Sequence, residues 1–328
     1  MTCRSIIRGV GAYLPPRVVS NDELARRVDT SDEWITRRTG IRQRHVAAGE
    51  DRTSGLAIRA GQAALADAGI DAATIDLVIV ATASADHIFP ATASAVQGGL
   101  GIPAGAAAFD VQVACSGFVY ALVTADNMLR LGQARRALVI GAEIMTRLLD
   151  WNDRATCVLF GDGAGAVCLE AVDGADGAAA DANRGLIASV LGGDGAFYDQ
   201  LYVDGGVGST GQSGHIRMAG REVFRHAVQR MTESVETVLA RAGLTPGELR
   251  WLVPHQANLR IMTAVGEKLG IAEDRLVCTV DRYANTSAAT IPMALAHGRQ
   301  QKLFKPGDAM VLTAMGGGFG WGAVALRW

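Results

Sequence analysis

The sequence predicts an α/β fold made of two similar halves. Short apolar segments alternate along the chain with longer segments of helical periodicity, which is the pattern of α/β proteins. Four stretches of the first half recur in the same order in the second half, most of them roughly 170 residues later. Hydrophobic residues make up 49% of the 328 residues and charged residues 20%, so a large core is expected and a disordered chain is excluded.

The expected strands are short apolar runs bounded by polar or small residues. They are Ile75–Ala83, Ala107–Val113, Arg136–Gly141, Trp251–Val253, Leu276–Val280 and Met310–Thr313. The expected helices have apolar residues three and four positions apart, which places these residues on one face. They are Ser54–Ala68, Gly117–Leu131, Gly220–Ala242 and Ala257–Leu269.

The internal repeat gives the order of the two halves. It pairs Leu77–Ala83 with Leu249–His255, Phe109–Phe118 with Cys278–Ala289, Ala137–Glu143 with Ala309–Met315, and Phe160–Glu170 with Phe319–Trp328. One pair could arise by chance, but four in the same order indicate a duplication. The polar, Gly/Ala-rich segment Val172–Arg184 is the expected boundary between halves at 1–175 and 185–328. A site in such a protein would take residues from equivalent turns of both halves.

Charge and cysteine content exclude several functional classes. The 31 basic and 33 acidic residues give a net charge of −2, without the basic excess expected of a nucleic-acid-binding domain. The five cysteines show no CxxC pair and no zinc-ligand spacing, so we expect neither a disulfide framework nor a metal. No apolar run reaches the ~18 residues of a membrane span, and no signal-peptide pattern is present. We therefore expect a cytoplasmic protein without membrane association.

Cys115 is a candidate nucleophile. It stands in VACSGF, between an expected strand and an expected helix. The free N–H groups and the positive dipole end of a helix stabilise a thiolate, so we expect a lowered pKa for this thiol. Free cysteines are more often small buried residues. We expect that role for Cys3, Cys157, Cys168 and Cys278, whereas for Cys115 its placement leaves both roles equally open.

His255 and Asn285 follow apolar segments of the second half. His255 stands in WLVPHQAN, and Asn285 stands in YANTSAAT, in the turn that the repeat equates with that of Cys115. Judged alone, an Asn at such a place is more often a helix N-cap. The glycine-rich segment Gly316–Gly322 lacks the lysine of a P-loop. It either directs backbone N–H groups at a ligand oxygen or makes a tight turn between the last two strands, two equally good interpretations.

With these residues placed, the sequence closely resembles the β-ketoacyl-acyl-carrier-protein synthase III family. The matching motifs are GVGAYLP (Gly9–Pro15), TSDEWI (Thr30–Ile35), RTGIRQRH (Arg38–His45), ACSGF (Ala114–Phe118), FGDGAGA (Phe160–Ala166), VPHQANLRI (Val253–Ile261), NTSAA (Asn285–Ala289) and GGGFGWG (Gly316–Gly322). The resemblance implies a thiolase-like, five-layered αβαβα fold of two duplicated halves, usually in a homodimer.

The resemblance also implies an acyltransferase that starts fatty-acid synthesis by a decarboxylating Claisen condensation. Cys115 would take an acyl group from acyl-CoA, with acetyl-CoA as the expected primer, while the backbone N–H groups of Cys115 and Gly317 form an oxyanion hole. His255 and Asn285 would donate hydrogen bonds to the thioester carbonyl of malonyl-acyl-carrier protein as it loses carbon dioxide. The resulting carbanion would attack acyl-Cys115, and no metal or redox cofactor is expected.

Further residues match substrate contacts of the family. Trp34 and Arg154 match the pair that sandwiches the CoA adenine, and Phe89 matches a residue that reaches the partner subunit's acyl pocket. Accessory contacts to CoA or its pantetheine arm are implied for Thr30, Arg38 and Asn258. Docking of the acidic carrier protein is implied for Arg225, Arg260 and Lys268, although Glu267 replaces one basic residue of the usual pair. Without the resemblance, a solvated helix face explains these arginines equally well.

Two further departures and several alternatives remain. Gly320 replaces the Thr or Ser that is usual before Trp321, and we expect a looser last loop there. Ala284 stands where relatives commonly have Gly, and alanine would be strained there if the backbone needs a positive φ. A related synthase of secondary metabolism would share the Cys, His and Asn. A non-catalytic paralogue that binds acyl-CoA or carrier protein is disfavoured because all three are present. A thiolase would need a second cysteine where Ala314 and Met315 stand, and no papain-like motif surrounds Cys115.

Overall fold

The computed structural model describes residues 3–172 and 183–328. The predicted boundary Val172–Arg184 lies almost wholly outside the described residues, so the division into halves at that place stays a prediction.

Two sheets of matching topology form the frame of the molecule. The first has the order β1 (Arg4–Tyr13), β7 (Asp162–Val172), β6 (Arg136–Ile144), β4 (Leu77–Ala81) and β5 (Ala107–Val111). The second, taken from the corresponding edge, has the order β8 (Gly185–Gly193), β13 (Gly320–Arg327), β12 (Ala309–Gly316) and β11 (Trp251–Pro254). In each sheet the first two pairings are antiparallel and the third is parallel. This correspondence confirms the predicted duplication.

The strand expected at Leu276–Val280 is wrong, because only Leu276 pairs, through one parallel bridge to Leu252. The buried side chain of Gln256 takes the place of further strand pairing there. Its Nε2 donates to the Val277 carbonyl at 3.0 Å, and its Oε1 accepts from the Thr279 N–H at 2.7 Å. The chain then turns into the short helix α9 (Val280–Tyr283) instead of continuing as a strand.

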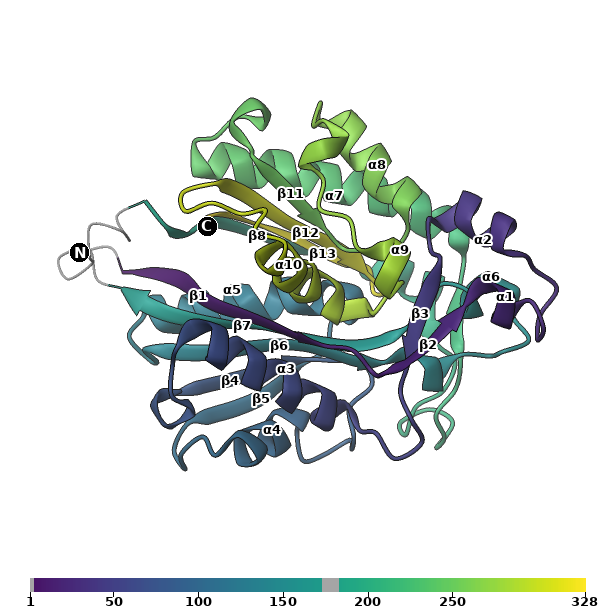
Figure 1. Cartoon of the computed structure of the whole chain (residues 1–328), viewed down its shortest axis with the longest axis horizontal. Helices are drawn as coiled ribbons and strands as arrows, with labels where there is room; N and C mark the ends of the chain where they lie inside the picture. The colour runs from purple at the N-terminus through teal and green to yellow at the C-terminus, as the bar shows by residue number, and fades with distance from the viewer. Residues whose placement is uncertain (1–2, 173–182) are drawn as a thin grey trace.

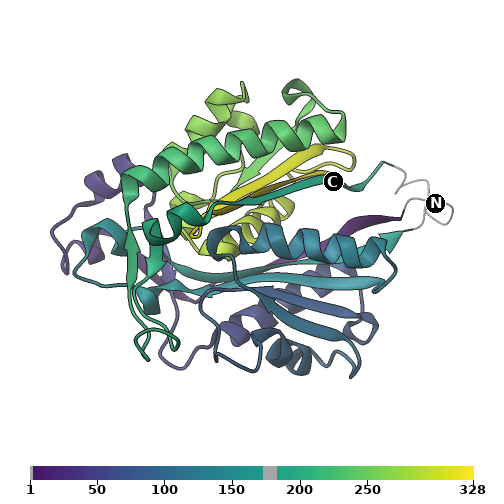
Figure 2. The ribbon, with the colours of Figure 1, turned by 180° about the vertical axis from the view of Figure 1, so that it is seen from behind.

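Helices complete five layers (Figure 1). α3 (Thr53–Ala68) and α4 (Thr92–Leu100) cover the outer face of the first sheet, while α7 (Gly220–Ala242) and α8 (Leu259–Lys268) cover that of the second. Between the sheets lie α5 (Gly117–Arg130) and α10 (Thr290–Gln300), which contact both. Figure 2 shows the same layers from behind. The αβαβα architecture is confirmed, and the four predicted helices lie within two residues of their expected bounds.

Two glycines let the middle layer approach the first sheet closely. A Cβ on Gly141 of β6 would lie 2.3 Å from the Ala288 carbonyl oxygen, and one on Gly165 of β7 would lie 2.5 Å from the Met293 nitrogen. Both neighbouring residues belong to the second half of the chain. The glycines therefore allow the segment around α10 to pack directly on the first sheet.

The remaining elements are short. They are β2 (Arg17–Ser20), α1 (Asn21–Leu24), α2 (Asp32–Thr39), β3 (Gln43–Val46), α6 (Arg154–Cys157), β9 (Leu201–Val203) and β10 (Ile216–Met218), with 3₁₀ turns η1 (Ala72–Thr74), η2 (Ala114–Ser116), η3 (Met145–Leu148), η5 (Gly195–Gln200), η6 (Pro246–Glu248), η7 (Glu273–Arg275) and η8 (Ser287–Ala289). α1, α2, α6, α9, β2 and β3 gather at one end of the layers (Figure 1). Within the described ranges, no helix combines the length and apolar character that a membrane crossing requires.

Candidate active site

Cys115, His255 and Asn285 line one cavity of about 90 Å³. Cys115 lies in η2, directly before α5, and His255 directly follows β11. Asn285 lies between α9 and η8, ahead of α10. We call the turn that contains Cys115 the cysteine turn and the turn that contains Asn285 the asparagine turn. The duplication therefore places the cysteine turn of one half opposite the asparagine turn of the other. Apolar side chains of α7, among them Phe224 and Met231, line the same cavity.

The Cys115 thiol is buried, with 7% of the residue exposed. Burial raises its pKa to about 12, and the Glu143 carboxylate acts in the same direction, while the Ser287 hydroxyl acts against both. The lowered pKa expected from the helix N-terminus is therefore wrong for the unloaded chain, because desolvation of the thiolate outweighs that effect. Cys115 therefore rests as a thiol in this cavity, and it would have to lose its proton to act as the expected nucleophile.

His255 is neutral in this cavity. The residue is 3% exposed, and burial lowers its pKa to about 3. Its Nδ1 lies 2.7 Å from the Thr290 hydroxyl oxygen, which also lies 3.0 Å from the Ser287 carbonyl oxygen. Because the Thr290 hydroxyl has one proton for two acceptors, it selects the tautomer of His255. Donation from Nε2 requires that Thr290 give this proton to Nδ1.

Asn285 is held by backbone and side-chain bonds together. Its Oδ1 accepts the Ser287 N–H at 2.8 Å, so its Nδ2 remains as the donor group. Its backbone N–H donates to the Leu159 carbonyl at 3.0 Å, and its carbonyl accepts from Gly161 N–H at 3.0 Å. This side-chain bond is of the Asx-turn kind and lies one residue ahead of Thr286, the N-cap of η8, so the N-cap role expected for Asn285 is wrong. The bond leaves the amide NH₂ available to a ligand.

Strained backbone surrounds these residues. Ala114, Ala284 and Ser287 have φ values of 43°, 56° and 50°, a region that non-glycine residues occupy at a cost of about 1–3 kcal/mol each. All three lie within two residues of Cys115 or Asn285. The strain expected for an alanine at Ala284 is confirmed.

The glycine-rich segment forms the turn between β12 and β13 and also lies against the cysteine turn. Gly316 pairs with Gly320 across this turn. A Cβ on Gly316 would lie 2.7 Å from the Cys115 nitrogen, and one on Gly317 would lie 2.5 Å from the Leu201 carbonyl oxygen. The tight turn between the last two strands is confirmed, whereas the direction of its N–H groups towards a ligand oxygen stays a prediction. The oxyanion hole made by the N–H groups of Cys115 and Gly317 stays a prediction.

The two residues expected to sandwich the CoA adenine lie together, but they contact each other directly and leave no space between them. The guanidinium carbon of Arg154 lies 4.8 Å from the centre of the Trp34 ring, and that of Arg38 lies 4.7 Å from it. Arg154 also donates to the Asp29 carbonyl at 2.6 Å. An aromatic base between Trp34 and Arg154 would add a second stacking contact, so the two groups would have to lie farther apart than their present 4.8 Å. Arg154 would therefore have to move for an adenine to stack there.

Other predicted contact residues lie in different surroundings. Asn258 lines the cavity, and its side chain caps α8 by accepting the Arg260 N–H at 2.9 Å. Thr30 is half-buried, and its hydroxyl oxygen is buried without a hydrogen bond. Phe89 does not line the cavity of its own chain, because 84% of the residue is exposed beside Ile88, which is 75% exposed.

The predicted docking residues lie exposed on α7 and α8. Arg225 is partly neutralised because it donates to Glu222 at 2.7 Å. The guanidinium carbon of Arg260 lies 5.5 Å from the ring centre of Phe224, a residue that lines the cavity. Hydrogen bonds from Gln229 and Arg230 lower the pKa of the Glu233 carboxyl. The charge of the nearby Lys268 adds a smaller effect in the same direction.

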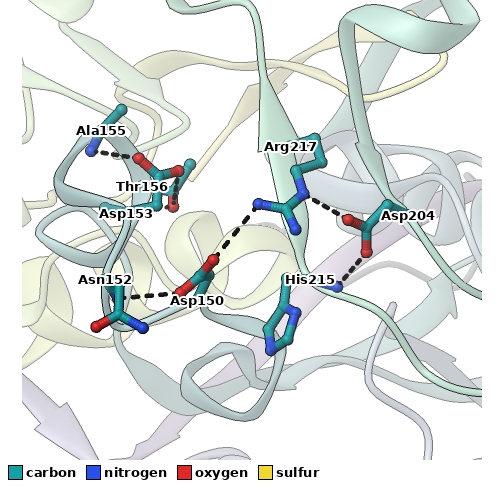
Figure 3. Close-up of polar contacts among 8 residues, drawn as sticks. All are labelled: Asp150, Asn152, Asp153, Ala155, Thr156, Asp204, His215 and Arg217. Atoms are coloured by element: carbon teal, nitrogen blue, oxygen red, sulfur yellow. Dashed lines mark hydrogen bonds and ion pairs between the residues drawn. The ribbon is translucent and has the colours of Figure 1, made fainter.

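An ionic network that sequence reasoning missed fixes the turn before α6 (Figure 3). Arg217 of β10 lies 3.6 Å from a carboxylate oxygen of Asp150 and donates to Asp204 at 2.5 Å. The His215 N–H donates to Asp204 at 2.6 Å. Together these contacts tie the β9–β10 hairpin to the turn that carries Arg154. The sequence shows only a weak signal for it, the two aspartates Asp150 and Asp153 just before α6.

Glu143 is a second residue that sequence reasoning missed. It lies buried near the end of β6, close enough to Cys115 to affect the thiol pKa. The available signal was a carboxylate at the end of an apolar strand, where the repeat has Met315. Across residues 3–172 and 183–328, no group of three or more His, Cys, Asp or Glu side chains is arranged to hold a metal ion.

Comparisons with known proteins agree on one family. A model described as 3-oxoacyl-(acyl-carrier-protein) synthase III matches residues 109–195, and one described as the C terminal of the same enzyme matches residues 239–328. A β-ketoacyl-(acyl-carrier-protein) synthase III of Rhodobacter capsulatus is 57% identical over 328 residues, which cover 100% of both chains.

Two solved structures extend this comparison. The 3-oxoacyl-(acyl-carrier-protein) synthase III of Aquifex aeolicus has a TM-score of 0.92 and 42% identity, with 99% of this chain and 100% of that chain covered. The priming β-ketosynthase of the R1128 polyketide pathway has a TM-score of 0.90 and 34% identity, with 98% and 96% covered.

Proposed function

The chain belongs to the β-ketoacyl-acyl-carrier-protein synthase III family, and we propose that Cys115, His255 and Asn285 carry out its reaction. It is a condensing enzyme that starts fatty-acid synthesis by joining an acyl group to the malonyl unit of a carrier protein. The observation that supports this assignment of residues is that all three line one cavity, although they come from different turns of the chain.

In the first step, the Cys115 sulfur attacks the thioester carbonyl of acyl-CoA and holds the acyl group as a new thioester. A thioester keeps the acyl group reactive while CoA leaves. The N–H groups of Cys115 and Gly317 are the proposed donors to the oxyanion, where one donor is typically worth ~10²–10³ in rate. Supporting this assignment, the glycine turn lies against the Cys115 backbone.

In the second step, malonyl-acyl-carrier protein loses carbon dioxide, and its carbanion attacks acyl-Cys115. His255 Nε2 and Asn285 Nδ2 donate to the thioester carbonyl on which enolate charge develops. The pKa of about 3 supports an uncharged imidazole that acts as a hydrogen-bond donor. Both residues are at least 95% buried, so charge developing beside them is poorly screened and the two hydrogen bonds are strong.

Acyl-CoA enters over Trp34 and Arg154, with Thr30, Arg38 and Asn258 as accessory contacts. This requires Arg154 to leave the Trp34 ring, as described above. The carrier protein is acidic in this proposal and docks on Arg225, Arg260 and Lys268. The position of Arg260 against Phe224, at the wall of the cavity, supports this surface.

The enzyme acts as a cytoplasmic homodimer in which Phe89 reaches the partner subunit's acyl pocket. The exposure of two adjacent apolar residues, Ile88 and Phe89, supports an apolar contact at this tip. The proposed substrates, acyl-CoA and acyl-carrier protein, support the cytoplasmic location.

A related synthase of secondary metabolism remains the second candidate, because the R1128 priming enzyme shares the fold at 34% identity. A thiolase is disfavoured because Met315, which lines the cavity, stands where the second cysteine is needed.

Purified protein, malonyl-acyl-carrier protein and a panel of acyl-CoA primers test this proposal. We expect carbon dioxide and acetoacetyl-acyl-carrier protein from acetyl-CoA. If no product forms from short, branched or longer primers, the protein is not an initiating synthase. If only an unusual primer is accepted, the second candidate is favoured.

A further inference from the structure

A buried carboxyl group beside the nucleophile has no role in the mechanism above. Glu143 is fully buried near the end of β6. Three donors hold its carboxylate, all from the turn after β4: the Ser84 hydroxyl at 2.6 Å, the Thr82 hydroxyl at 3.2 Å and the Ala83 N–H at 3.1 Å. Burial raises its pKa to about 7 even though these hydrogen bonds act against it, so that it can both accept and release a proton near neutrality.

These bonds leave one oxygen of Glu143 less occupied. Oε2 accepts from Ser84, Thr82 and Ala83, whereas among the described residues Oε1 only shares the Ala83 N–H, at 3.2 Å. Ser84 is itself fixed, because its hydroxyl oxygen accepts the Ile144 N–H at 2.9 Å. The carboxylate is therefore held at a fixed place and retains acceptor capacity.

Ser287 lies near both Glu143 and Cys115, because η8, which carries it, packs against both β6 and η2. Its hydroxyl oxygen is buried and makes no hydrogen bond of ordinary length, yet it is near enough to both groups to lower the pKa of each. The residue is held with a φ of 50° by the bond from its N–H to Asn285. A buried hydroxyl without a partner is costly, and so is this backbone conformation. Both features occur at Ser287, whose hydroxyl lies near the thiol and the carboxylate alike.

We propose that Glu143 receives the thiol proton of Cys115 through the Ser287 hydroxyl during acylation, keeps it while Cys115 carries the acyl group, and returns it after condensation. Glu143 and Ser287 are then positioning residues, since they act on substrate only through Cys115. This inference rests on the proposed function. It links the two halves, because Glu143 belongs to the first sheet and Ser287 to the asparagine turn of the second half.

The atoms and charges of this cycle balance. In acylation, a bond forms between the Cys115 sulfur and the acyl carbon, and the bond from that carbon to the CoA sulfur breaks. The thiol proton passes to Ser287 as the Ser287 proton passes to Glu143, and CoA leaves as a thiolate that solvent protonates. In condensation, the malonyl-derived carbanion attacks the acyl carbon, and the Cys115 sulfur leaves with the electron pair. Glu143 then returns its proton through Ser287.

His255 is less suited to this role. Its pKa of about 3 makes it a much weaker base than Glu143, whose pKa is about 7. Its Nε2 is also needed as a donor in the condensation. Separate residues for proton storage and enolate stabilisation let both steps occur without changing the protonation of His255.

The test measures the rate of Cys115 acylation by acetyl-CoA against pH, using rapid quench and intact mass. In the wild type we expect the rate to rise as pH passes through about 7, because Glu143 becomes a carboxylate. For Glu143→Gln we expect a rate about 10²-fold lower at pH 8 and no such rise, since general-base assistance is typically worth ~10²–10⁴-fold. Glu143→Asp should restore part of the rate together with the pH dependence.

Ser287→Ala tests the relay without touching the carboxylate. We expect it to slow acylation at least about 10-fold at pH 8 while the protein stays folded. Ser234→Ala, at a buried serine of α7 outside the site, is the matched control and should acylate like the wild type.

A folded Glu143→Gln variant with the wild-type pH profile overturns the relay, whether its rate is unchanged or uniformly reduced. If that variant does not fold, a folded Ser287→Ala variant with the wild-type rate and profile overturns it. The relay is tested by the ratio of the acylation rate of each variant to that of the wild type. The proposed function is tested separately, by whether the wild type forms the β-ketoacyl product. Failure of the relay can therefore be told apart from failure of the proposed function.

Discussion

The cysteine turn and the asparagine turn occupy equivalent places in the two halves but are built differently. Cys115 follows the regular strand β5, which pairs with β4. Asn285 follows a segment with one bridge in place of a strand, held by the side chain of Gln256. Its own backbone bonds to Leu159 and Gly161 of the first half.

This difference shows how a duplicated frame acquires a site with two different functions. The strand before Cys115 and the helix after it place this residue, the proposed nucleophile, at the end of a regular element. The loss of the equivalent strand frees the asparagine turn to cross towards the first half, where it supplies Asn285 and Ser287. Strained backbone occurs in both turns, at Ala114 beside Cys115 and at Ala284 and Ser287 beside Asn285, so it is not what distinguishes them.

The largest expected effect comes from removing the nucleophile of the cysteine turn. Cys115→Ala should abolish covalent acylation, because none of the other four cysteines lines the cavity. Intact mass after incubation with acetyl-CoA measures this. Acylation retained at wild-type stoichiometry would place the nucleophile elsewhere and remove the functional contrast between the turns.

The second effect concerns the side chain that replaces the missing strand. Gln256→Leu leaves the buried Thr279 N–H and Val277 carbonyl without partners, at about 1–3 kcal/mol each. We expect a loss of at least about 2 kcal/mol in the free energy of unfolding, measured by denaturant titration. Gln229→Leu, at a half-buried glutamine of α7 that donates only to the Glu233 side chain among the described residues, is the control and should change stability little. Equal stability of the two variants would show that Gln256 does not hold the asparagine turn.

A third effect is the pH dependence of stability caused by His255, which follows β11 of the second half. Burial lowers its pKa to about 3, so between this value and about 6.5 the unfolded chain binds one more proton than the folded one. Stability from this group is complete above pH 6.5 and is lost as the pH falls below it, by up to about 1.4 kcal/mol per pH unit.

The measurement compares the slope of unfolding free energy against pH in wild type and His255→Gln. Between pH 4 and 6 we expect a smaller slope in the variant. The difference should reach up to about 1.4 kcal/mol per pH unit, which corresponds to one proton. Identical slopes would mean that His255 titrates alike in the folded and unfolded chain, and so is not held neutral by burial.

The smallest expected effect is a gain in the stability of the fold. Ala284→Gly relieves a backbone with φ 56° and ψ −160°, a region almost restricted to glycine, and should raise stability by about 1 kcal/mol. Thermal unfolding checks this. A lower melting temperature would mean that the Ala284 methyl group contributes more through packing than its strained backbone costs.

Sequence reasoning predicted the frame because its signals are local. The helix Gly220–Ala242 and the strand Trp251–Val253 follow from periodicity, and the repeat relates the Cys115 turn to the Asn285 turn. The strand at Leu276–Val280 failed because its apolar run matches a strand, whereas its polar backbone groups are satisfied by Gln256, about 20 residues away in the sequence.

Other features could not be predicted because they depend on how the halves meet. The raised pKa of Cys115 arises from burial between the layers, not from its place at a helix end. Glu143 and Ser287 are about 140 residues apart in the sequence, so no local pattern relates them. The contact of Arg154 with Trp34 likewise joins distant segments.

The most direct test of the division of labour between the turns uses His255→Ala. After incubation with acetyl-CoA, malonyl-acyl-carrier protein is added, and one mass measurement follows both acyl-Cys115 and acetoacetyl-acyl-carrier protein. We predict full acylation with condensation slowed by about 10²–10³-fold, because the variant lacks one donor to the enolate. If His255→Ala abolishes acylation as completely as Cys115→Ala does, the assignment of loading to the cysteine turn and of condensation to the second half is contradicted.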